Sequence, residues 1–163
     1  MRTFGASGRR TPARPRCTGD DGAALIEFSL LAPFLFLIIF GIIDFGYAFG
    51  QWLDVRHGAR EGSRLVAVNY QNPTTPRTGA NQTTLDIIPA TCARMDISKG
   101  DTITIALPNG ANKGAVATIT VSKPLTQITG FLQPWLNGKT FSSTVQTRLE
   151  KNATFAAGTG TCP

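Results

Sequence analysis

The chain has 163 residues, 42% of them hydrophobic, and a formal net charge of +6. This length suits about one small domain and excludes a large multidomain enzyme. Residues 1–22 carry five of the sixteen basic side chains, so the rest of the chain holds eleven basic and eight acidic residues, a net charge of +3. Such scattered charge gives no support for nucleic-acid binding, and we expect no nucleic-acid partner.

The chain begins with a polar arm, residues 1–22. It is rich in Gly, Pro, Arg and Thr and offers almost no apolar side chains for burial. We therefore expect a disordered cytoplasmic segment here, which is a candidate leader.

A transmembrane helix is the next predicted element. Residues 28–50 are apolar, contain one ionisable residue, Asp44, and are long enough to cross a hydrocarbon layer about 30 Å thick. The run exceeds the roughly 7–15 apolar residues of a removable secretory signal, so we expect it to stay attached. Five arginines precede the span, and fewer follow it closely, which favours a cytoplasmic N-terminus and a C-terminal domain outside the cytoplasm.

Helical periodicity continues beyond the span. Residues 51–69 contain no proline, and Leu53, His57, Arg60, Arg64 and Val68 follow one another at helical spacings. We therefore expect one helix over residues 23–69, whose last part forms a stalk. Residues 72–81 contain two prolines and a glycine and predict a hinge. The remainder, residues 70–163, is the expected extracytoplasmic domain.

This outer domain is predicted to be a small α+β unit. Apolar residues recur at helical spacings within residues 82–95, which predicts a short helix that Pro89 kinks or divides. Beyond Gly100 the period changes to two and predicts a hairpin of strands at residues 102–107 and 115–123. A last strand is expected at 140–150. The predicted fold class is thus α+β, with a long transmembrane and stalk helix followed by an antiparallel sheet domain and a short helix.

Two cysteines lie in the exported part of the chain. An oxidising compartment favours a disulfide between Cys92 and Cys162, whereas Cys17 lies in the cytoplasmic arm. Zinc binding is the alternative, but no C-x-x-C spacing occurs and the single histidine, His57, lies beside the span. We therefore expect a disulfide and no metal site.

Glu27 stands at the inner edge of the apolar run, five residues after Gly22. A carboxylate at this boundary needs a partner or access to water. If a protease cuts between Gly22 and Ala23, the new ammonium group lies about one helical turn from Glu27, which can then guide side-by-side assembly. Alternatively, Glu27 simply reaches the lipid headgroups. The residues alone leave both interpretations open.

The segment from Gly22 to Phe28, followed by an apolar helix, is similar to the processing site of type IV pilin-like precursors. More narrowly, the first part of the chain resembles the TadE-like family of pilin-like proteins from the tight-adherence (Tad/Flp) pilus system. The residues that carry this likeness are Glu27, Phe28, Pro33, Gly41, Asp44, Phe45, Gly46, Ala59, Arg60, Glu61 and Gly62.

The resemblance implies a structural role in assembling an adhesion pilus. It implies cleavage by a prepilin peptidase between Gly22 and Ala23, with Glu27 as the assembly carboxylate, and a location in the bacterial inner membrane or within the pilus. Expected partners are the peptidase, other Tad pilins and pseudopilins, the assembly platform and membrane lipid. The alternative hypothesis is an uncleaved, single-pass anchored module whose outer domain binds a ligand or surface.

Two features of the helix bear on packing. The first is a row of glycines whose spacings are multiples of four residues: Gly46, Gly50, Gly58 and Gly62. This row predicts a flat helix face for close packing, although such patterns also arise by chance. The second is Asp44, which must face protein or water because a carboxylate facing lipid is costly. Either a partner helix bonds it, or it lies near enough to the outer interface to be solvated.

No catalytic signature is present in the sequence. There is no nucleophile elbow, phosphate-binding loop, dinucleotide-binding glycine pattern or metal-spaced histidine pair. We therefore expect neither an enzyme nor a bound cofactor.

Overall fold

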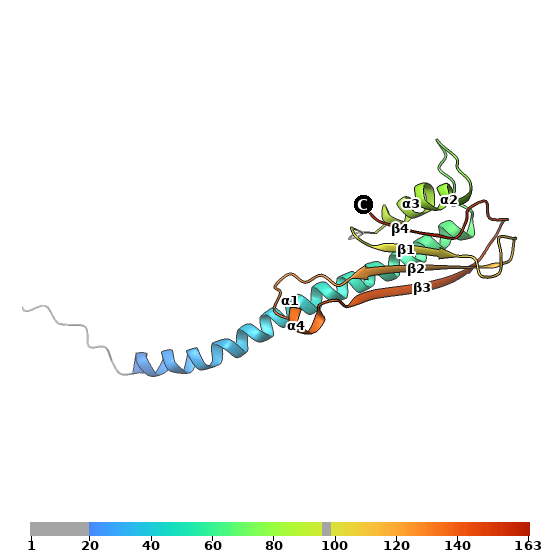
Figure 1. Ribbon diagram of the computed structural model, residues 1–163. Helices are drawn as coiled ribbons and strands as arrows, with labels where there is room; N and C mark the ends of the chain where they lie inside the picture. Colours follow the sequence, from blue (N-terminus) through green and yellow to red (C-terminus); the bar gives the residue numbers. More distant parts are fainter. Residues whose placement is uncertain (1–19, 96–98) are drawn as a thin grey trace, which may run out of the picture. The chain divides into compact units, whose positions relative to one another are not determined.

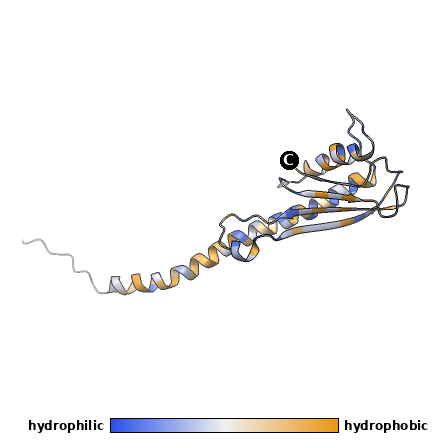
Figure 2. Cartoon of the chain, viewed as in Figure 1, coloured by the Kyte–Doolittle hydropathy of each residue, from blue (hydrophilic) through white to orange (hydrophobic). Residues whose placement is uncertain are grey.

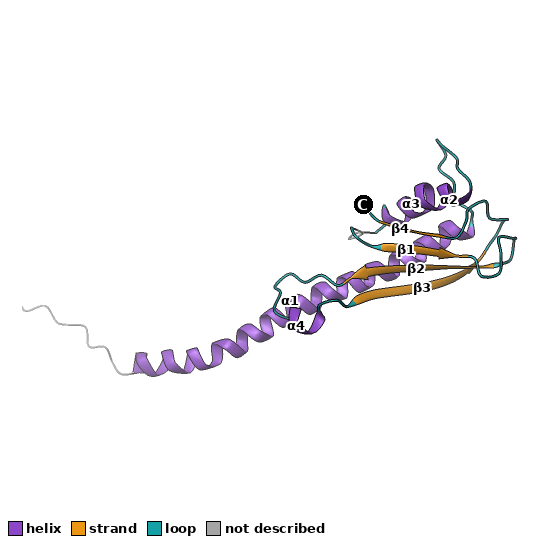
Figure 3. Cartoon of the chain, viewed as in Figure 1, coloured by secondary structure: helices purple, strands orange, loops and turns teal. Residues whose placement is uncertain are grey.

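The computed structural model describes residues 20–95 and 99–163. Most of the predicted leader, residues 1–19 with Cys17, lies outside the described residues. The helices and strands in chain order are α1 (Asp20–Ala67), α2 (Gly79–Gln82), the π-helical turn η1 (Thr83–Ile87), α3 (Ile88–Cys92), β1 (Thr102–Ala106), β2 (Val116–Pro124), α4 (Gln133–Leu136), β3 (Thr140–Arg148) and β4 (Gly158–Thr161) (Figures 1 and 3).

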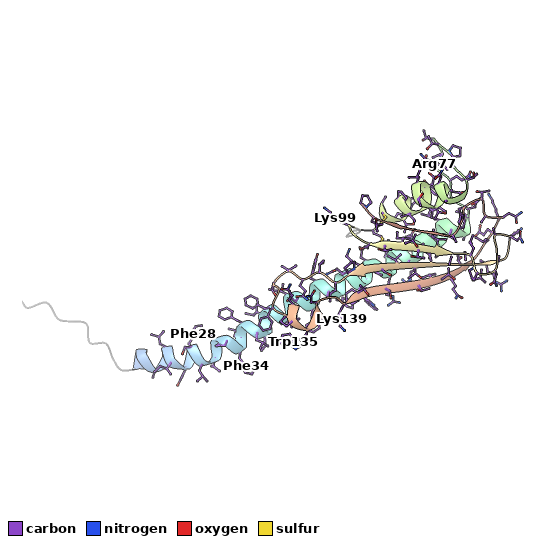
Figure 4. All side chains as sticks on the ribbon, viewed as in Figure 1. Phe28, Phe34, Arg77, Lys99, Trp135 and Lys139 are labelled. Carbon is purple, nitrogen blue, oxygen red and sulfur yellow. A yellow bond between two sulfur atoms is a disulfide. The ribbon has the colours of Figure 1, made fainter. Side chains whose placement is uncertain are left out.

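The contacts divide the chain into two units, Met1–Ile39 and Phe40–Pro163. In the first unit, the described residues belong to α1, and their apolar side chains are exposed. Figure 2 colours most of this part of α1 as hydrophobic, and Phe28 and Phe34 project from the helix in Figure 4. Among the described residues, α1 is the one helix long and apolar enough to cross a membrane. The predicted long apolar helix is confirmed.

The second unit contains a four-stranded antiparallel sheet with strand order β3-β2-β1-β4. β1 and β2 form the predicted hairpin, in which Ile105 pairs with Ile119. β3 pairs with β2 along its whole length and follows the predicted last strand closely. The predicted α+β fold is confirmed, but the sheet has one strand more than the sequence predicted.

The C-terminal half of α1 packs against the inner face of this sheet, and Figure 1 shows the strands running along it. The inward residues of the strands alternate with polar ones and form the core with Val55, Ala59 and Val66 of α1: Ile103, Ile105, Ala117, Ile119 and Val121. Close approach requires glycine at position 62, because a Cβ there would overlap the Ile119 side chain. The stalk and the outer domain thus share one core.

A left-handed residue ends α1. Asn69 has φ 56°, a conformation that Asn tolerates better than most residues. The Tyr70 N–H donates to the Leu65 carbonyl at 2.9 Å and the Asn69 N–H donates to the Val66 carbonyl at 3.1 Å, which is the Schellman arrangement. The helix therefore stops near its predicted end and the chain turns toward α2.

The helical segment predicted at residues 82–95 forms as three short pieces. The α2 turn leads into the π-helical turn η1, and α3 follows with Pro89 in its first turn. Proline is tolerated there because its missing N–H is not needed at the start of a helix. The predicted division of this helix is thus present, one residue before Pro89.

Candidate functional site

The N-terminal end of α1 carries the predicted processing site. Gly22 and Ala23 lie in the first turns of this helix, which begins at Asp20. Both residues are exposed, and a Cβ added at Gly22 would meet nothing within 4 Å. Helix ends fray, so this bond can open to a peptidase without unwinding the rest of α1. Cleavage here stays a prediction.

Glu27 lies one turn further along the same exposed stretch. Its apolar neighbours are largely exposed, with 69% of Ile26 and 61% of Phe28 accessible. A carboxylate in such surroundings is suited either to a partner charge or to the lipid headgroups, as the sequence suggested. Pro33 follows within the helix, where it removes the hydrogen bond that its N–H would make to residue 29.

Asp44 is bonded by its own chain rather than by solvent. It is 1% exposed, although it lies in the predicted span. The Thr129 backbone N–H donates to Asp44 Oδ1 at 3.0 Å, and the Thr129 hydroxyl donates to Asp44 Oδ2 at 2.6 Å. The sequence predicted that Asp44 faces protein or water and left open a partner helix or solvent as its environment. A loop from the outer domain supplies the hydrogen bonds.

A second fastening lies two helical turns further along α1, at Gln51. Its amide donates to the Thr126 carbonyl at 2.8 Å, and its Oε1 accepts from the Thr126 N–H at 3.1 Å and hydroxyl at 3.0 Å. Gln51 is fully buried. We call residues 125–139 the collar loop, because Thr126 and Thr129 tie it to α1 at two points.

The four glycines of the predicted packing row divide into two pairs. Gly58 lies against Met95, and Gly62 lies against Ile119 and Thr91, so both contact the outer domain of the same chain. A Cβ at Gly46 or Gly50 would meet nothing within 4 Å. Only this second pair is open to another helix, and helix packing there stays a prediction.

Cys92 and Cys162 are joined by a disulfide, with their Cα atoms 5.7 Å apart. It links α3 to the residue after β4 across 70 positions of sequence. Because β4 is an edge strand of only Gly and Thr, it contributes few apolar contacts of its own. The covalent link therefore supports the weakest strand of the sheet.

A buried ion pair joins Lys123, near the end of β2, to Asp101, the residue before β1. Lys123 is 3% exposed and Asp101 is fully buried, and the Lys123 ammonium donates to Asp101 Oδ1 at 2.6 Å. Burial raises the pKa of Asp101, and the bonded, charged Lys123 opposes this shift. The pair fixes β2 to the start of β1 and involves no residue of the N-terminal site.

No metal-binding cluster is found among residues 20–95 and 99–163. No group of three His, Cys, Asp or Glu side chains in this part of the chain is arranged to bind a metal ion. His57 is exposed on α1. The described part of the chain thus presents an exposed apolar helix and the attached collar loop as its candidate functional features.

Comparison with known proteins locates a family relationship on α1. Residues 22–64 match the family model described as TadE-like protein. Over this segment the chain is similar to TadE-like proteins. The match begins at Gly22, the residue before the predicted cut, and continues into the stalk. No curated protein and no solved structure matches the chain.

The TadE-like match confirms the predicted family resemblance and associates the chain with the pseudopilins of Tad pili. It favours a structural, pilus-associated protein over a catalytic one. The one long apolar helix found in the described part of the chain is consistent with a single-pass membrane anchor in such a system. The collar loop lies outside the matched residues and was not predicted, because Thr126 and Thr129 carry no local signal of their partners on α1.

Proposed function

We propose that this chain is a minor pilin-like subunit that takes part in assembling a Tad-type adhesion pilus. A prepilin peptidase cuts between Gly22 and Ala23 and removes residues 1–22 as a leader. Residues 23–69 then form the membrane helix and stalk, and residues 70–163 form the outer domain. The other partners are the remaining Tad pilins and pseudopilins, the assembly platform and the lipid of the bacterial inner membrane.

One observation carries this proposal: the TadE-like match starts at Gly22, and the exposed apolar helix follows directly. A subunit that packs beside its neighbours through a helix needs a helix whose apolar face its own domain leaves uncovered. Leu30, Phe34 and Ile42 are each more than 65% exposed. These side chains can contact lipid before assembly and neighbouring helices after it.

Glu27 has a defined part in this scheme. Cleavage creates an ammonium group at Ala23, four residues from the Glu27 carboxylate and therefore on the same helix face. At the membrane boundary, where water is scarce, each charge lowers the free-energy cost of placing the other there. This holds whether the two charges belong to one chain or to neighbouring chains. The carboxylate thus favours side-by-side alignment of cleaved subunits.

The proposal is tested by complementing cells that lack this gene but retain the rest of the Tad system. The Gly22→Leu variant should remain uncut and restore no pili. The Glu27→Gln variant should be cut but restore far fewer pili than the wild type, because it removes the charge and preserves the shape. Ser29→Ala is the matched control on the same exposed stretch and should restore both cleavage and pili.

Normal piliation by both Gly22→Leu and Glu27→Gln would refute the processing and assembly roles. Uncut wild-type protein in piliated cells would favour the alternative, an anchored binding module that acts without maturation.

A further inference from the structure

The collar loop exposes an apolar surface at the outer end of the predicted span. Its large apolar side chains are poorly covered, with 63% of Ile128, 40% of Phe131 and 68% of Trp135 accessible. The centroid of the Phe131 ring lies 6.4 Å from that of the Phe40 ring of α1, so the loop contacts the helix within its apolar stretch. Figure 4 shows Trp135 on α4 beside α1. A soluble loop would not ordinarily expose this much apolar surface.

Charge is missing from this loop until its end. The sequence from Leu125 to Gly138 contains no Asp, Glu, Lys or Arg, and Lys139 follows it. An apolar groove of about 590 Å³ lies between the loop and α1. It is lined by Phe45, Phe49 and Trp52 of the helix and by Leu136 and Phe141, with Lys139 the single charged residue among its described lining residues. Aromatic rings with a nearby lysine are typical of the membrane interface.

The position of the loop also bears on where the membrane-crossing part of α1 ends. The collar loop buries Asp44 and Gln51 and so covers one face of the helix from Asp44 onward, whereas Phe45 and Phe49 stay 64% and 57% exposed. Ala23–Ile43 is the stretch of α1 that precedes this covered face. These are about 21 residues, which rise about 31 Å and match the hydrocarbon thickness of about 30 Å. The span predicted at residues 28–50 would instead require the polar Thr126 and Thr129 attachments to lie within hydrocarbon.

We propose that the collar loop rests on the outer leaflet of the bilayer, with Ile128, Phe131 and Trp135 among the acyl chains and Lys139 at the phosphates. The partner is phospholipid. The inference rests on the proposed membrane anchoring and adds to it a second, interfacial contact. A second copy of the chain is the competing occupant, but the uncharged loop, its aromatic side chains and its level on α1 favour lipid.

Tryptophan fluorescence in lipid nanodiscs holding one full-length chain tests this proposal. Trp52→Phe leaves Trp135 as the single tryptophan, because the sequence contains two. The discs are made of phosphatidylcholine brominated at either shallow or deep acyl positions. Two controls in a tryptophan-free background report on positions on either side of the proposed contact: Phe34→Trp lies in the predicted span, and Val68→Trp lies just after the end of α1.

We expect Trp135 to be quenched more by the shallow than by the deep bromines and to emit at shorter wavelength than Val68→Trp, which should be unquenched. Phe34→Trp should be quenched most by the deep bromines. Thr129→Val should reduce the quenching of Trp135, because it loosens the loop from Asp44.

Three outcomes would overturn the proposal. An unquenched Trp135 beside a quenched Phe34→Trp would leave the anchor intact and refute the loop contact. Quenching of neither residue would refute the membrane anchor and the loop contact together. Shielding of Trp135 from water only in discs that hold two chains would assign the surface to a second copy.

Discussion

The attachment of Thr129 to Asp44 makes a quantitative prediction. Thr129→Val keeps the shape of the side chain but removes the hydroxyl that donates to Asp44 Oδ2 at 2.6 Å. The backbone N–H bond to Oδ1 at 3.0 Å remains. Hydrogen bonds to charged groups contribute about 1.5–3 kcal/mol, so docking of the collar loop should weaken by about 2 kcal/mol. The open population of the loop then rises about 30-fold.

Amide hydrogen exchange of the full-length protein in nanodiscs measures this change directly, because local opening governs exchange in such a loop. Thr126→Val provides a graded comparison. It removes a hydroxyl bond to the neutral Gln51 amide, which contributes about 1 kcal/mol, so exchange should rise only about fivefold. Thr120→Val, which removes a hydroxyl bond to Thr144 on the exposed sheet face, should leave exchange in the loop unchanged. Equal exchange in Thr129→Val and wild type would refute the argument that Asp44 holds the loop.

Three further predictions concern the outer domain and its junction with the stalk. Replacing both Cys92 and Cys162 with serine should lower the free energy of unfolding by about 4 kcal/mol for a 70-residue loop, measured by denaturant titration, and reductant should abolish the difference from wild type. Lys123→Met should lower the free energy of unfolding by about 3–5 kcal/mol because it leaves the buried Asp101 carboxylate without its cationic partner. Adding Asp101→Leu should restore most of this stability, and no restoration would argue against the pair. Gly62→Ala should destabilise the outer domain by about 1–3 kcal/mol because the added Cβ overlaps Ile119. Gly50→Ala should be neutral or stabilise the helix by up to about 1 kcal/mol, because a Cβ there meets nothing. Equal shifts of the melting temperature in the two variants would contradict this contrast.

Local sequence signals predicted much of the fold. The apolar run and its continuation without proline predicted α1 to within a few residues of its ends. Alternation of apolar and polar residues predicted β1, β2 and β3, because β1 and β2 bury one face and β3 half-buries one face. β4 was missed because its sequence, Gly158–Thr161, has no apolar residue to alternate. Its place in the sheet comes from pairing with β1 and from the disulfide that follows it.

The partners of polar groups were harder to predict, since they are distant in sequence. Asp44 and Thr129 are separated by 85 residues, and no local pattern relates them. One signal was available: Lys123 continues the inward row of β2 after Ala117, Ile119 and Val121. A lysine on a buried face needs a bonded acidic partner, so the sequence could have pointed to an ion pair there. The spacing of the glycines likewise predicted close packing, but not that Gly58 and Gly62 would face the chain's own outer domain.

The collar loop changes how the anchor is understood. Asp44 is a polar residue in an apolar span, and its hydrogen bonds to Thr129 satisfy its carboxylate where it is buried. In the proposed arrangement, this attachment lies near the outer boundary of the membrane, and Glu27 with the new N-terminus lies at the opposite boundary. The proposal thus assigns both ends of the membrane-crossing segment to named residues of α1.

The N-terminal sequence of the protein extracted from membranes tests the central claim most directly. It should be determined in cells with and without the prepilin peptidase. We predict a start at Ala23 that is replaced by the uncut N-terminus when the peptidase is absent. An uncut N-terminus in both strains would contradict maturation as a pilin-like subunit and leave an anchored outer domain as the better account.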